Sequence, residues 1–161
     1  MPRLWILSDL HLDAVPYPEA FRPPRPVFDI LVVAGDVWQG SSARALEIVA
    51  GLAGGKPAVF VMGNHEPWHR ELHQERAAAR RTAARQGVVM LDDGEAELAG
   101  VRFIGGTLWA DGQLGGQDAT PGMTTGEQVR IAHAGGARLI TVGDAAALHR
   151  ACAAERNRKA A

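Results

Sequence analysis

Three short apolar runs, each followed directly by polar residues and spaced at nearly equal intervals, constrain the fold more than any other feature of this sequence. Their β-branched content is typical of buried strands, and they cover Leu4–Leu7, Ile30–Ala34 and Ala58–Met62. The polar clusters after them include Asp9, Asp36 and Asn64, at intervals of 27 and 28 residues. Each interval has the length of a strand–helix–strand unit. Parallel neighbouring strands would bring all three clusters to one edge of a sheet.

Two segments with helical character lie between and after these runs. Ala43–Leu52 has a helical apolar pattern and follows two N-cap candidates, Ser41 and Ser42. The segment from Pro67 to Gln86 is rich in Ala, Arg, Glu and Leu; Pro67 suits a first helical position, and Gly87 is placed to end the helix. This alternation of strands and helices predicts an α/β fold.

Beyond residue 87 the pattern changes from crossovers to a predicted meander. Three close strands are expected at Val88–Leu91, Ala96–Leu98 and Val101–Thr107, with turns at Asp92–Gly94 and Gly100. Loops are expected at Arg22–Pro26 and Asp111–Gly126. A last helix from about Asp144 to Arg156 completes one domain over residues 1–156, and residues 157–161 form a polar tail.

Composition narrows the class of protein. The chain has 161 residues, of which 47% are hydrophobic and 22% charged, as in an ordinary globular domain. Its net charge of −1 gives no general attraction to nucleic acid or anionic lipid. Cys152 is the only cysteine, so no internal disulfide can form. No apolar stretch approaches the roughly 20 residues that cross a bilayer. We therefore expect a cytoplasmic protein with no membrane or nucleic-acid partner.

The residue types at the strand ends suit a pair of divalent metal ions. Asp9 and His11 are two positions apart, so on an extended chain their side chains point to the same side and can bind one ion together. Asp36 can bridge two ions about 3.5–4 Å apart, and Asn64 offers an amide oxygen to the second ion. Oxygen and nitrogen ligands without thiolate indicate Mn, Fe or Zn. Hydrolysis of a phosphate ester is the natural reaction of such a pair.

The three clusters resemble the first motifs of the calcineurin-like metallophosphoesterase superfamily, which are Asp-x-His, Gly-Asp and Gly-Asn-His-Asp/Glu. Asp9/His11, Gly35-Asp36 and Gly63-Asn64-His65-Glu66 match them in order, and the Gly-Thr-Leu-Trp-Ala-Asp run within Phe103–Asp111 is similar to bacterial members. The resemblance implies a sandwich of β-sheets flanked by helices. It also implies that Asp9, His11 and Asp36 hold the first metal, that Asp36 and Asn64 hold the second, and that His65 contacts the phosphate or protonates the leaving group.

Downstream, the sequence departs from the family pattern. The family supplies a later strand ending in His and a Gly-His-x-His segment, and neither is present; His133 and His149 are not expected to be ligands. We therefore expect an incomplete domain without its last strands, whose exposed strand edges a second copy or a complementing chain would cover. Two hypotheses follow. The chain is a metal-dependent phosphoesterase acting on phosphate mono- or diesters, or a non-catalytic truncated paralogue that acts through a partner.

Other patterns favour simpler interpretations. His65-Glu66-Pro67-Trp68-His69 matches the zinc-protease signature, which needs both histidines on one helix, and Pro67 argues against that. His69 and His73 are expected on a solvated helical face. The tryptophans near the motifs, Trp38, Trp68 and Trp109, suit either substrate stacking or core packing.

Overall fold

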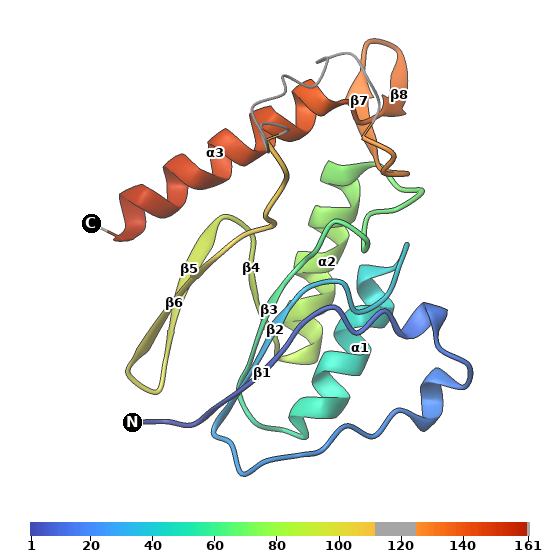
Figure 1. Ribbon diagram of the computed structural model, residues 1–161. Coiled ribbons are helices and arrows are strands. Elements are labelled where there is room, and N and C mark those ends of the chain that lie inside the picture. The colour runs from blue at the N-terminus through green and yellow to red at the C-terminus, as the bar shows by residue number, and fades with distance from the viewer. Residues whose placement is uncertain (112–124, 161) are drawn as a thin grey trace.

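A four-stranded parallel sheet forms the centre of the computed structural model, which describes residues 1–111 and 125–160 (Figure 1). The strands stand in sequence order: β1 (Leu4–Leu7), β2 (Ile30–Ala34), β3 (Ala58–Val61) and β4 (Val89–Leu91). Leu7 pairs with Val33, and Val33 pairs with Phe60. This register makes the residues after the first three strands leave the sheet side by side, which confirms the arrangement predicted from their spacing.

Two helices cover one face of this sheet, α1 (Ser42–Ala53) and α2 (Leu72–Gln86) (Figure 1). The side chain of Ser41 accepts a hydrogen bond from Arg44 N and caps α1, while Gly87, at φ 67°, ends α2 as predicted. The expected start of α2 at Pro67 is wrong. Residues 66–69 form a turn, and Glu71 caps the helix by accepting from the backbone N–H groups of residues 73 and 74.

A hairpin covers part of the other face. β5 (Gly94–Leu98) and β6 (Val101–Gly105) pair antiparallel, and Leu98 and Phe103 pack against the cluster that includes Ile30, Val59 and Leu91. The predicted three-stranded meander is therefore wrong for its first strand. β4 pairs parallel with β3 and belongs to the central sheet, so only β5 and β6 form the antiparallel hairpin. The parallel sheet thus lies between helices and a hairpin, and the predicted α/β class with sheets flanked by helices is confirmed.

The crossover from β1 to β2 contains no α-helix. It has two short 3-10 turns, η1 (Leu12–Ala14) and η2 (Pro18–Ala20), followed by extended chain. Five prolines between residues 16 and 26 explain this, because each lacks the amide proton that a helix interior needs.

The last part of the chain holds a hairpin that the sequence did not predict, followed by the last helix that it did predict. β7 (Arg130–His133) and β8 (Gly136–Leu139) form a second hairpin, which leads into α3 (Val142–Ala160). This helix continues through residues 157–160, where a polar tail was expected. Most of the predicted loop Asp111–Gly126 lies outside the described residues. Among the helices that the structure describes, none combines the length and apolarity that crossing a bilayer requires.

Candidate metal centre

The loop after β1 is tied to the loop after β2 by a ladder of backbone hydrogen bonds. Asp9 N donates to Gly35 O at 3.1 Å, His11 N to Asp36 O at 2.9 Å, and Leu12 N to Val37 O at 3.0 Å. These bonds continue the pairing of the parallel strands beyond the sheet edge. The first two polar clusters therefore form a single rigid unit.

Two glycines let the loop after β3 join this unit. A Cβ atom on Gly35, whose φ is 82°, would lie 2.5 Å from Gly63 N, and a Cβ atom on Gly63 would lie 2.1 Å from Asp36 Oδ1. No side chain fits at either position, since real Cβ contacts are never this short. The glycines in the Gly-Asp and Gly-Asn motifs are thus required by the close approach of the two loops.

Three polar residues at this edge have left-handed backbone conformations. Asp9, His11 and Asp36 have φ values of 53°, 41° and 54°. Non-glycine residues in this region cost of order 1–3 kcal/mol each and persist where surrounding contacts hold them. The backbone ladder provides those contacts. The strained conformations are therefore held in place, and each side chain leaves the backbone in a fixed direction.

Glu66 ties the second and third loops together from inside the protein. Its side chain has no solvent exposure, and its carboxylate accepts hydrogen bonds from four backbone N–H groups. The donors are Gly63 and Val37 at 2.7 Å, Asp36 at 3.1 Å and Trp38 at 3.3 Å. Burial raises the pKa of Glu66, and the hydrogen bonds from these backbone N–H groups oppose that rise. Sequence reasoning placed Glu66 in a motif but missed this structural role.

His65 lies between two aromatic rings and next to Asp36. Its ring stacks on Trp68 with centroids 4.5 Å apart and meets the His11 ring edge-on at 4.8 Å. Its backbone N–H donates to Asp36 Oδ1 at 2.9 Å. Among the described atoms, the buried Nδ1 of His65 has no hydrogen-bond partner. An unpartnered buried nitrogen in a polar site needs an explanation, and a ligand is one.

The predicted metal ligands and His65, which was predicted to contact the phosphate, fall into two overlapping groups that share Asp36. His11, Asp36 and His65 offer ligand atoms that all lie within 4.8 Å of one another. Asp9, Asp36 and Asn64 line one cavity of about 360 Å³, next to Thr107. This set of carboxylate, imidazole and amide donors fits one or two divalent cations.

The other histidines lie apart from this cluster in the described part of the chain. His69 is in a turn with φ 62°, which removes the helix that a zinc-protease site would need. His133 is exposed on β7, and His149 Nδ1 is hydrogen-bonded to Trp109 O at 2.7 Å. Neither His133 nor His149 belongs to the group of possible metal ligands found among the described residues.

Glu127 is the second residue that sequence reasoning missed. Its carboxylate accepts from Asn64 Nδ2 at 2.9 Å and from Trp68 Nε1 at 2.6 Å. Because the amide nitrogen of Asn64 is engaged in this way, its oxygen remains available to the cavity. Glu127 is 63 positions from Asn64, and no local pattern marks it.

A family model described as calcineurin-like phosphoesterase matches residues 2–123, which include all three motif loops. No curated protein matches the chain. The family match covers the parallel sheet, both helices that pack on it and the β5–β6 hairpin.

Proposed function

The chain belongs to the calcineurin-like phosphoesterase family, and from that premise we propose that it hydrolyses phosphate esters at a dinuclear metal centre held by Asp9, His11, Asp36 and Asn64. Asp36 carries the proposal, because it belongs both to the histidine cluster and to the cavity. A residue shared by two ligand groups is the expected position of a bridging carboxylate. The donor types favour Mn, Fe or Zn.

When bound, two such ions supply Lewis acidity toward the phosphate and toward the attacking water. The protein's own contribution is geometric. The backbone ladder and the buried Glu66 fix the carboxylates in place, while Glu127 turns the Asn64 oxygen toward the cavity. His65, held by Trp68 stacking, is proposed to contact the phosphate or to give a proton to the leaving oxygen.

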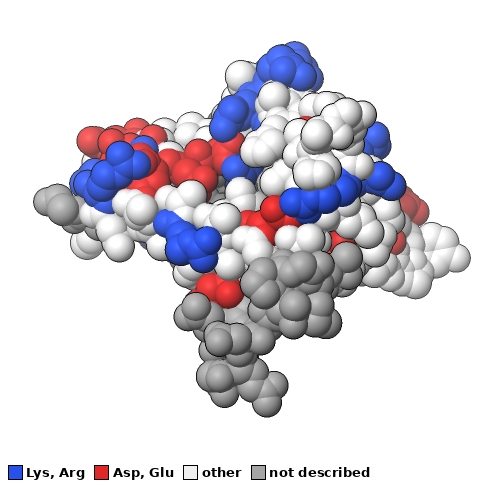
Figure 2. All heavy atoms as spheres, turned by 90° about the horizontal axis from the view of Figure 1, so that it is seen from above, with Lys and Arg blue, Asp and Glu red and all other residues white. Residues whose placement is uncertain are grey.

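The proposed substrate is a small phosphate mono- or diester. Among the described residues, the face seen from above the view of Figure 1 carries both basic and acidic side chains among uncharged ones (Figure 2). Long nucleic acid binds best to a continuous basic surface, so mixed charges favour a compact ester.

A cytoplasmic location belongs to the same proposal. Cys152 is buried with 2% exposure, and burial raises its pKa to about 11, as suits a thiol that stays reduced.

The direct test measures hydrolysis of bis-p-nitrophenyl phosphate and p-nitrophenyl phosphate by the purified chain with Mn²⁺. We expect Asp36→Asn to lower kcat/KM by at least about 100-fold, since it removes the shared ligand. Glu47→Gln, an exposed carboxylate on α1, is the matched control and should leave the rate unchanged. Equal rates for the wild type and Asp36→Asn would overturn the proposal.

One observation favours the alternative of a non-catalytic chain with a partner. β1 is the first strand in the sheet order, and its side chains Leu4 and Ile6 are 39% and 63% exposed. An edge strand with exposed apolar residues is a template for pairing with another chain. Under this alternative, Ile6→Lys changes the sedimentation behaviour of the protein and Asp36→Asn has no effect on any ester hydrolysis.

A further inference from the structure

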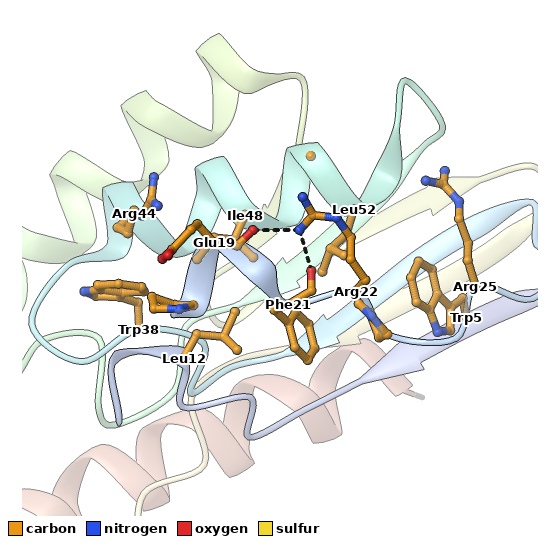
Figure 3. A pocket seen from close by; sticks show the side chains of 13 residues that line it. Trp5, Leu12, Glu19, Phe21, Arg22, Arg25, Trp38, Arg44, Ile48 and Leu52 are labelled. Atoms are coloured by element: carbon orange, nitrogen blue, oxygen red, sulfur yellow. Dashed lines mark hydrogen bonds between the residues drawn. The ribbon is translucent and has the colours of Figure 1, made fainter. Parts of the chain in front are cut away.

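A second cavity of about 500 Å³ lies between α1 and the segment that contains η2 (Figure 3). None of the proposed metal ligands lines it. Its volume is within the range of sites that bind small molecules. Because its walls come from three separate parts of the chain, it is a feature of the folded domain.

The inner wall of this cavity is apolar. One face of α1 contributes Ile48 and Leu52, and the opposite segment contributes Phe21 (Figure 3). Trp5 and Leu12 lie deeper, with 7% and 2% exposure. Aliphatic side chains opposite aromatic ones suit a flat apolar body.

Three exposed arginines line the cavity and give it an excess of positive charge. Arg22 donates to the backbone oxygens of residues 19 and 21, and Arg25 donates to Ala53 O, so neutral carbonyls hold both guanidinium groups. Arg44 lies 5.3 Å from the centre of the Trp38 ring and pairs with Glu47 outside the cavity. Glu19 is the one acid that lines the cavity within the described chain. This excess of positive charge is complementary to an anion.

We propose that this cavity, called here the arginine pocket, binds a small organic anion with a flat apolar body, such as an aryl carboxylate or aryl sulfonate. The apolar wall packs against the ring of the ligand, and the guanidinium groups bind its carboxylate or sulfonate. Binding does not require the metal centre, so the metal-free protein is the sample for the test. Failure of this proposal is thereby separate from failure of the proposed phosphoesterase activity.

The first experiment titrates metal-free protein with 2-naphthalenesulfonate by isothermal calorimetry. The same titration with neutral 2-naphthol and with inorganic sulfate separates the apolar and ionic contributions. We expect the sulfonate to bind at least about tenfold more tightly than either fragment. Equal binding of naphthol and naphthalenesulfonate would overturn the proposal, and so would no detectable binding of the sulfonate at millimolar concentration.

Variants then locate the site. Gly51 lines the arginine pocket within α1, and a Cβ atom there meets nothing within 4 Å, so Gly51→Leu fills the cavity without strain and improves helix propensity. We expect it to weaken sulfonate binding at least tenfold, and Arg44→Gln to weaken it severalfold. Arg150→Gln, an exposed arginine on α3, is the matched control with unchanged affinity. Full affinity in Gly51→Leu with an unchanged circular dichroism spectrum would refute this location.

Discussion

The motif loops and the last hairpin and helix are held in the protein by very different means. The loops after β1, β2 and β3 are joined by backbone ladders, glycine contacts and the buried Glu66. β7 and α3 are attached through individual links, such as Arg130 N to Arg70 O and the side chain of Arg102 to Lys159 O. Only Ala145 and Cys152 are buried among the described side chains of α3. We infer that the first region fixes the proposed metal ligands, and that the second, together with Glu127 just before β7, adjusts the orientation of Asn64.

Removal of Glu66 is expected to have the largest effect on stability. Glu66→Ala leaves four backbone N–H groups without their acceptor in the interior, and each unsatisfied group costs about 1–3 kcal/mol. We expect urea unfolding to show a loss of at least about 3 kcal/mol. Glu97→Ala, on the exposed side of β5, should change stability by less than about 0.5 kcal/mol. A loss under about 1 kcal/mol for Glu66→Ala would contradict the inference that the motif loops are held together more firmly than the last hairpin and helix.

A pair of glycine substitutions compares the two regions directly. Gly35 and Gly135 both have positive φ, at 82° and 78°, but only the first contacts another loop. Gly35→Ala adds a clash with Gly63 to the backbone strain, so we expect a loss above about 2 kcal/mol; strain alone costs Gly135→Ala about 1 kcal/mol. Thermal unfolding of both variants measures the difference. Equal losses would mean that the close approach of the two motif loops does not contribute to the free energy of unfolding.

The same contrast explains what the sequence could predict. β1, β2 and α1 lie where local apolar patterns and a serine cap indicated, because their signals reside within each segment. The start of α2 was missed because Glu66 is held by the distant 36–38 loop, which keeps residues 66–69 in a turn. β7 and β8 are short and half exposed, so they lack the pattern of a buried strand. Contacts such as Glu127 with Asn64 depend on the tertiary fold and leave no mark in the sequence.

Removing Glu127 should affect the metal centre more than the fold. Glu127→Ala frees the Asn64 amide to rotate and leaves Trp68 without its acceptor, so we expect the affinity for Mn²⁺ to fall about tenfold. The free energy of unfolding should fall by about 1 kcal/mol. Calorimetric titration with Mn²⁺ measures the first effect, and Gln128→Ala serves as a neighbouring control. Unchanged Mn²⁺ affinity would show that the second region does not adjust the site.

The smallest effect concerns the link between β8 and α3. Arg138 holds the Asp144 carboxylate with two hydrogen bonds, and Asp144 also accepts from both the hydroxyl and the backbone N–H of Thr141, which caps the helix. The hydrogen bond from Arg138, ahead of those from Thr141, holds the pKa of Asp144 well below its usual value of 3.8.

Because the folded pKa is depressed, this contribution is complete above pH 3.8 and is lost as the pH falls toward the folded pKa. Asp144→Asn should lower stability by about 1 kcal/mol at pH 7. The deficit should shrink as the pH falls below 3.8, because the unfolded wild type then binds a proton that the folded wild type does not. Urea unfolding at pH 7, 4 and 2.5, with Glu97→Gln as an exposed control, measures this convergence. A deficit that stays constant across this range would mean that the cap works without its charge, and that α3 is held by packing of Ala145 and Cys152 alone.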